Sequence, residues 1–189
     1  MLTKKKVASI HKLNQRALRA KDKEKRAMLA EALGLAHLSY RKNRNSSTTL
    51  QLGRILLHNL KFTAALRLYR SLLKAKNAPA RHAVYNGIGN AYRYMATYDK
   101  SNARQYKLAL HFNKKALASA PINTRGIYWS NLAITCANLK QWDDAIKAAK
   151  KSIHLLRKEE KQGIKHGNQI KILQLEIALW GEYKKRTLY

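Results

Sequence analysis

One stretch of the sequence restricts the fold more than any other, because its apolar residues repeat at a helical spacing, pause, and repeat again. Counted from the first, small and apolar residues stand at offsets 0, 3, 4, 7, 13, 16 and 17: Trp129, Leu132, Ala133, Cys136, Trp142, Ala145 and Ile146. Steps of three and four residues place side chains on one face of an α-helix. The spacing therefore predicts two antiparallel helices over about 125–158, joined by a turn and packed through these faces.

Two earlier stretches carry the same pattern. The first has its small and apolar residues at Leu52, Gly53, Leu56, Phe62, Ala65, Leu66, Tyr69 and Leu72. The second has them at Tyr85, Ile88, Gly89, Tyr92, Tyr106, Ala109, Leu110, Ala116 and Leu117. We expect Gly53 to lie where two helices approach closely, because it has no Cβ to keep them apart. Pro79 and Pro121 follow the two stretches, and each is expected to end a helix because proline cannot continue one.

The three units resemble tetratricopeptide repeats, in which a helix, a turn and a second helix recur with a period of about 34 residues. The resemblance covers about 49–158 and implies an all-α fold, a right-handed α-solenoid of about three helical hairpins. Half-a-tetratricopeptide repeats would give nearly the same architecture. The sequence departs from the family pattern at Leu56 and Cys136, where an aromatic residue is usual. It also has about eight extra residues within 95–105, which either lengthen both helices of the second unit or form a protruding loop.

The segments on either side of the repeats complete the expected organisation. Residues 1–48 are interpreted as a basic N-terminal helical arm, with helices from about Lys4 to Lys25 and from about Arg26 to Tyr40, or one continuous helix. Residues 49–158 form the repeats, and 159–189 a capping helix with a basic tail. The apolar residues of the last segment fall on one face of a helix over 169–183: Ile170, Leu173, Ile177 and Trp180. Solenoids need such a helix to cover the last hairpin.

Charge is the second strong constraint. The chain has 39 Lys and Arg against 10 Asp and Glu, which gives a formal net charge of +29, while its hydrophobic content of 46% is that of a folded protein. Solubility needs far less charge than this. The excess therefore predicts a polyanionic partner, of which nucleic acid is the commonest, with an anionic membrane surface as the weaker alternative.

The sequence contains no pattern typical of catalysis. Its seven histidines have no metal-ligand spacing, and neither a glycine-rich phosphate loop nor a nucleophile turn is present. Cys136 is the single cysteine and occupies a small packing position of the third unit, so it is interpreted as a core residue. We expect no enzyme activity, no cofactor, no metal site and no small-molecule substrate. No apolar run approaches the length of a transmembrane helix.

The nucleic-acid hypothesis selects basic residues in charged runs and on helical faces. They are Lys4, Lys5, Lys6, Arg16, Arg19, Lys23, Arg26, Arg41, Lys42, Arg44, Arg93, Lys114, Lys115, Lys184, Lys185 and Arg186. The faces carrying Lys147, Lys150 and Lys151 add further charge. No base-reading module is visible, so we expect recognition of the phosphate backbone and of shape.

The first functional hypothesis is a non-catalytic, RNA-binding structural component of a ribonucleoprotein. By analogy of composition, a mitochondrial ribosomal protein is favoured, with ribosomal RNA and neighbouring proteins of a large assembly as partners. Residues 1–26 hold ten Lys and Arg among apolar residues and look somewhat like a mitochondrial transit peptide. The alternatives are a basic arm that stays on the protein and a cytoplasmic location.

The second hypothesis is a protein–protein adaptor, because proteins of the resembled family mostly bind peptides in a groove lined by the first helices of the hairpins. The resemblance places six residues in such a groove: Asn86, Asn90, Arg93, Tyr94, Asn131 and Asn138. The partner would be an acidic protein or a peptide. Asn90 and Asn131 match positions that hold a carboxylate in some family members, but the accompanying Lys and Arg are not clearly in place. A DNA-associated or membrane-surface factor is the third and weaker hypothesis.

Overall fold

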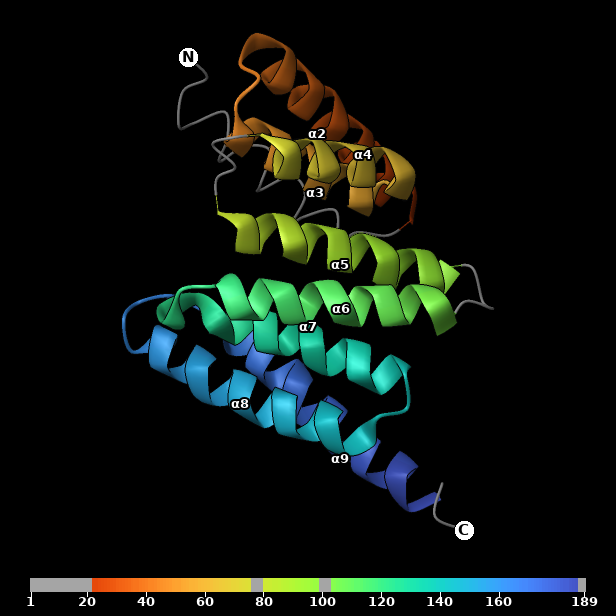
Figure 1. Cartoon of the computed structure of the whole chain (residues 1–189), viewed down its shortest axis with the longest axis vertical. Coiled ribbons are helices and arrows are strands. Elements are labelled where there is room, and N and C mark those ends of the chain that lie inside the picture. The colour runs from red at the N-terminus through yellow and green to blue at the C-terminus, as the bar shows by residue number, and fades with distance from the viewer. Residues whose placement is uncertain (1–21, 76–79, 99–102, 187–189) are drawn as a thin grey trace. The chain divides into compact units, whose positions relative to one another are not determined.

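Every regular element that the structure describes is helical. The computed structural model (Figure 1) describes residues 22–75, 80–98 and 103–186. The helices are α2 (Asp22–Lys42), α3 (Ser46–His58), α4 (Phe62–Lys74), α5 (Arg81–Tyr98), α6 (Ala103–Ser119), a 3-10 turn (Ile122–Thr124), α7 (Arg125–Asn138), α8 (Trp142–Glu160) and α9 (Gly167–Arg186). The all-α prediction is confirmed. The helix expected from Lys4 lies outside the described residues up to Asp22, where α2 begins.

The chain divides into two compact units, 1–79 and 80–189. The first contains α2, α3 and α4, and the second contains α5 to α9. This division differs from the expected boundaries at 48 and 158. Position 48 lies inside α3, which packs on α2, and position 158 lies inside α8, which packs on α9.

In the first unit, a polar cap starts the hairpin of α3 and α4. The side chain of Asn45 accepts a hydrogen bond from the Thr48 backbone N–H at 2.9 Å, and the Thr48 hydroxyl oxygen accepts one from the Asn45 N–H at 3.3 Å. This reciprocal capping box satisfies two N–H groups that have no partner within the helix. The predicted polar break over 41–49 therefore also positions the start of α3.

The hairpins α3–α4 and α7–α8 make the same turn, 80 residues apart. Leu60 and Lys140 each have a φ of 59°. In each turn the next residue donates its N–H to the carbonyl of a residue in the first helix: Lys61 to Leu56 and Gln141 to Cys136, both at 2.9 Å. Because a left-handed residue other than glycine is unusual, the shared geometry supports two copies of one repeating unit.

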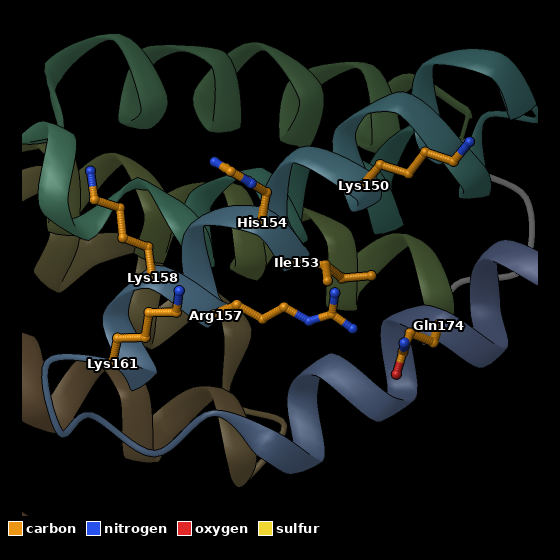
Figure 2. Close-up of a pocket in the computed structure, with 7 residues that line it drawn as sticks. All are labelled: Lys150, Ile153, His154, Arg157, Lys158, Lys161 and Gln174. Carbon is orange, nitrogen blue, oxygen red and sulfur yellow. The ribbon is translucent and has the colours of Figure 1, made fainter.

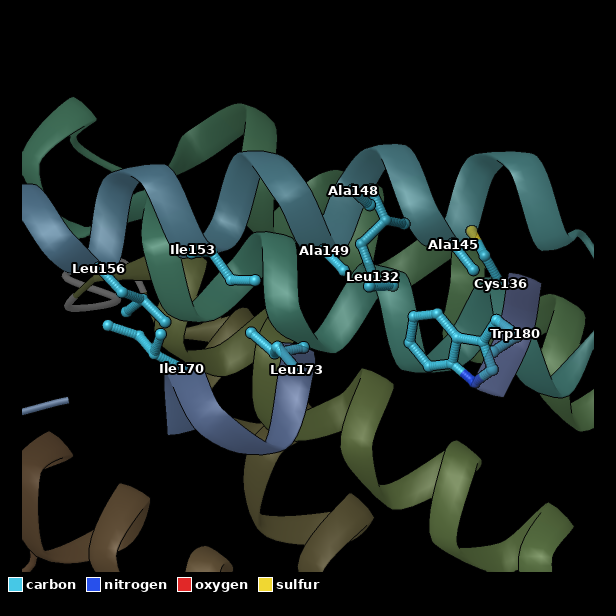
Figure 3. Close-up of a cluster of buried hydrophobic side chains, with 12 residues drawn as sticks. Leu132, Cys136, Ala145, Ala148, Ala149, Ile153, Leu156, Ile170, Leu173 and Trp180 are labelled. Carbon is cyan, nitrogen blue, oxygen red and sulfur yellow. The ribbon is translucent and has the colours of Figure 1, made fainter. Parts of the chain in front are cut away.

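The core of the second unit lies between α7, α8 and α9 (Figure 3). Small residues of α8, Ala145, Ala148 and Ala149, are buried and let the neighbouring helices approach. From α9, Ile170, Leu173 and Trp180 are buried in the same cluster, and Ile177 packs against it. The residues that the sequence placed on one face of the last helix therefore pack against the hairpin of α7 and α8. In addition, Lys184 pairs with Asp143 at 2.5 Å, which links the end of α9 to the start of α8.

The extra residues of the second hairpin lengthen its helices. α5 has 18 residues and α6 has 17, whereas α3 and α4 have 13 each. Of the two alternatives for 95–105, the structure thus supports longer helices, with 99–102 outside the described part.

Replacing Gly53 tests the close approach of α3 and α4. A Cβ at this position would stand 2.6 Å from Cε1 of Tyr69, which is buried. We expect Gly53→Ala to destabilise the first unit by about 1–3 kcal/mol, because the ring has to shift in a packed core. Urea denaturation followed by far-ultraviolet circular dichroism measures the change.

Gly34→Ala is the matched control, since a Cβ there meets nothing within 4 Å. It should leave stability unchanged or raise it by up to about 1 kcal/mol. Equal losses in the two variants would contradict the proposed close packing.

The Cys136 thiol should be protected in the folded protein. Its side chain is buried, and burial, with a smaller contribution from Asp144, raises the pKa of the thiol to about 11. At pH 8 only about 0.1% would be thiolate, compared with about a quarter in an unfolded chain. Alkylation by iodoacetamide should be slower by on the order of a hundredfold before urea is added than after, and similar rates would place the thiol in solvent.

Candidate functional site

An open groove between α8 and α9 is lined mainly by basic side chains (Figure 2). Its volume is about 820 Å³, and its lining residues are Lys150, Ile153, His154, Arg157, Lys158, Lys161 and Gln174. Six of these seven come from α8 or the residue that follows it, and Gln174 comes from α9. No carboxylate lines the groove. We call these seven residues the basic groove.

The helical repeat brings the cations of the basic groove onto one face of α8. Lys150, His154, Arg157 and Lys161 stand at i, i+4, i+7 and i+11, which places them in one row about 16 Å long. The opposite face of the helix is buried through Ala145, Ala149 and Leu156. Packing against α7 and α9 therefore turns the basic row outward. Figure 2 shows the Arg157 side chain extending from α8 toward Gln174.

Carboxylates near the basic groove are engaged with other groups. Glu159 pairs with His166 at 2.8 Å, and a Glu160 oxygen accepts a hydrogen bond from the His166 backbone N–H at 2.9 Å. Asp143 pairs with Lys184. Within the described part of the chain, none of the ion pairs involves a cation of the basic groove. The groove thus presents mainly hydrogen-bond donors and positive charge, an arrangement suited to an anionic ligand.

A second set of polar side chains joins the first helices of the hairpins. The Asn131 amide of α7 donates to the Asn86 side-chain oxygen of α5 at 2.8 Å. The Gln169 amide of α9 donates to the Ser130 hydroxyl oxygen of α7 at 3.1 Å. These contacts place parts of α5, α7 and α9 on one side of the second unit. We call this side the polar face.

Arg93 of α5 and Glu176 of α9 interact electrostatically. Burial raises the pKa of the half-buried Glu176 carboxyl, and the Arg93 guanidinium lowers it by a smaller amount. Arg93 also donates to the Asn90 side-chain oxygen at 3.4 Å, and its guanidinium lies 4.5 Å from the centre of the Tyr94 ring. The charge of this arginine therefore acts within the protein as well as toward solvent.

The structure brings most of the predicted peptide-groove residues together. Asn86, Asn90, Arg93 and Tyr94 lie on α5, and Asn131 reaches them from α7. Asn138 is exposed at the last residue of α7. The amides that were expected to bind a peptide are partly used to join α5 and α7, so a ligand at this face has to compete with these hydrogen bonds.

The predicted nucleic-acid residues are dispersed over both units. Lys4, Lys5, Lys6, Arg16 and Arg19 lie outside the described residues, as does the side chain of Lys23. Those exposed to solvent are Arg26, Arg41, Lys42, Arg44, Lys114, Lys115, Lys185 and Arg186. Lys184 and Lys185 pair with Asp143 and Glu182. The second unit does not gather its members of this set into one site.

The basic groove was missed by sequence reasoning, apart from Lys150. Arg157, Lys158 and Lys161 were not selected, although the row at i, i+4, i+7 and i+11 is visible in the sequence. That periodicity was a usable signal. What the sequence did not contain was the contribution of Gln174 or the hollow itself, because both depend on how α9 packs against α8.

The fold is similar to that of MamA, a helical protein that contains tetratricopeptide repeats. Two solved structures match at a TM-score of 0.51 and 20% sequence identity: a double mutant named MamA RS-1 ArsTM, and MamA 41-end from Desulfovibrio magneticus RS-1. Each comparison covers 97% of this chain and 93% of the other. No family model matches the sequence, and no curated protein does. The similarity supports a helical fold of the tetratricopeptide type.

None of the described helices is both long enough and apolar enough to cross a membrane. Within the same residues, no three His, Cys, Asp or Glu side chains are grouped so that they could hold a metal ion.

Neutralising Glu176 tests the effect of its burial. The pKa of this carboxyl is higher in the folded than in the unfolded protein. Below the pKa of an unfolded glutamate, near pH 4, the carboxyl is protonated in both states and does not reduce stability. As pH rises through the folded-state pKa, the carboxyl becomes charged in a partly buried place, and this lowers the free energy of unfolding. Glu176→Gln should therefore stabilise the protein at pH 7, by less than about 1 kcal/mol because solvent screens this half-exposed group. The gain should disappear in acid.

Thermal melting at neutral and acid pH measures this difference. Glu182→Gln is the control on the same helix, because Glu182 is exposed and pairs with Lys185 at 3.0 Å. It should give no gain at pH 7. A loss of stability in Glu176→Gln at pH 7 would show that attraction to Arg93 outweighs burial.

Proposed function

We propose that this chain is a non-catalytic helical-repeat adaptor that holds an acidic protein partner. The observation that carries the proposal is the basic groove, a hollow of about 820 Å³ lined by four Lys and Arg side chains, a histidine and no carboxylate. It lies on a scaffold of packed helical hairpins whose fold is similar to that of MamA. Such scaffolds offer long surfaces for binding, and the charge selects the sign of the partner.

The proposal includes the finer architecture expected from the repeats. The hairpins α3–α4, α5–α6 and α7–α8 would stack as a right-handed α-solenoid, with α9 as its cap. The shared turn geometry of the first and third hairpins supports equivalent units. Peptide binding at the polar face, through Asn90, Arg93 and Asn131, remains a prediction.

Nuclease-treated affinity capture, followed by direct binding, tests the adaptor proposal. Partners retained by the purified chain after nuclease treatment should be cross-linked and identified by mass spectrometry. We expect the cross-linked segments to be rich in Asp and Glu. Synthetic peptides of those segments should bind the purified chain, and binding should weaken as salt is raised. Loss of every partner on nuclease treatment would contradict the proposal.

RNA binding is the second candidate function, and the net charge of +29 favours it. The chain would then be a structural component of a ribonucleoprotein, such as a mitochondrial ribosome. Nuclease should release it from a large particle, and its affinity for RNA should fall steeply with salt, with a slope of about 0.7 per phosphate for single strands. The mitochondrial location stays a prediction because it rests on residues 1–26, most of which lie outside the described part.

A further inference from the structure

We propose that the basic groove is the primary site for the acidic partner, and that its occupant is an acidic protein segment with several carboxylates spread over about 16 Å. This inference rests on the proposed adaptor function and assigns the binding of the partner to a specific site. The site differs from the groove that the repeat resemblance indicated, because it lies between α8 and α9 and uses neither Asn90 nor Asn131.

The arrangement of charge in the groove defines the ligand. Lys150, Arg157 and Lys161 occupy one row on α8 and its end, with Lys158 beside them. With His154 counted between Lys150 and Arg157, successive members of the row are about 4–6 Å apart along the helix axis, whereas Lys150 and Arg157 themselves are about 10 Å apart. A protein segment that presents a carboxylate every three or four residues as a helix, or every two residues as a strand, can follow this row.

The remaining lining residues favour a protein segment over RNA. No Phe, Tyr or Trp side chain lines the groove, so the rings on which single-stranded RNA most often stacks are missing, and only His154 and the Arg157 guanidinium offer planar groups. Ile153 lines the groove but is largely buried. Lys158 also borders a smaller hollow of about 310 Å³, where Leu155 and the exposed Ile122 add apolar surface beside Gln162 and Glu159. Apolar surface beside a cationic row suits a peptide that alternates acidic and apolar residues.

Occupation by a partner would also balance charge that the protein leaves uncompensated. Exposed ion pairs are individually weak. Several cations that act on one segment add their contributions, and the fixed helix holds the row in place before the ligand arrives. Binding is therefore expected to be sensitive to salt and to depend on the row as a set.

The test compares two charge reversals of equal size and spacing. Lys150→Glu with Arg157→Glu changes the basic groove, and Arg67→Glu with Lys74→Glu makes the same change seven residues apart on the exposed surface of α4. The probe is a fluorescent peptide of about sixteen residues with Glu at every third or fourth position and Ala or Leu between. A peptide with Gln in place of Glu, and a single-stranded RNA of similar charge, are measured alongside.

We expect the acidic peptide to bind the wild-type chain and the α4 variant with similar affinity, and to bind the groove variant at least about tenfold more weakly. The Gln peptide should bind weakly to all three. Circular dichroism and thermal melting check that each variant is folded. If the groove reversal unfolds the protein, Lys150→Gln with Arg157→Gln replaces it, and a smaller loss of affinity in the same direction is expected.

The other outcomes distinguish a wrong assignment of the groove from a wrong proposal of the adaptor function. Equal weakening by the groove and α4 reversals would overturn the assignment of the groove while leaving an acidic partner in place. Binding of RNA but not of the acidic peptide by the wild-type chain would overturn both the assignment and the adaptor function. Loss of RNA binding only in the groove variant would identify the hollow as an RNA site.

Discussion

The structure depends on close approach between paired helices, which is possible only where one helix presents a very small residue. Gly53 makes room for the Tyr69 ring in the first unit, and Gly126 does the same for Leu156 in the second. In the last hairpin, Ala133, Ala145 and Ala149 are fully buried. Because a side chain that is larger by one methyl group already disturbs a packed interior, these positions fix the spacing of the helices.

This tight packing allows the outer faces to carry an unusual charge. A net charge of +29 repels itself, and the described residues offer few compensating ion pairs. The cations stand on faces turned away from the small residues, as in α8, whose inner face is largely alanine. A partner bound at the basic groove would relieve part of the repulsion, so binding and stability are expected to be linked.

Sequence spacing was sufficient for the parts of the structure that depend on local periodicity. The hairpin of α7 and α8 followed from residues three and four apart, and the buried face of α9 followed from Ile170, Leu173 and Trp180 on one side of a helix. The tight turn at Lys140 was harder to predict from the sequence, because lysine has no preference for a positive φ. Local pattern thus predicts which residues face inward more readily than it predicts how the turn is made.

The functional surfaces were harder to predict because they arise between helices. Lys184 was expected to face phosphate, but α9 crosses the start of α8 and brings this lysine to Asp143. The groove likewise needs Gln174 from α9, which is joined to α8 by a charged linker. The expected division at 158 falls inside α8 and assigns Lys161 and Gln174 to a different segment from the other lining residues of the candidate site.

Asn113 gives the second unit a property that apolar contacts alone do not provide. Its amide is buried, and it donates from α6 to the Thr135 hydroxyl at 2.8 Å and to the Asn131 carbonyl at 3.3 Å on α7. Apolar contacts are not directional, so two apolar helix faces can shift along each other at little cost in free energy. A buried hydrogen bond forms in only one relative position of the two helices. The hairpins α5–α6 and α7–α8 should therefore resist displacement relative to each other and unfold in one cooperative transition.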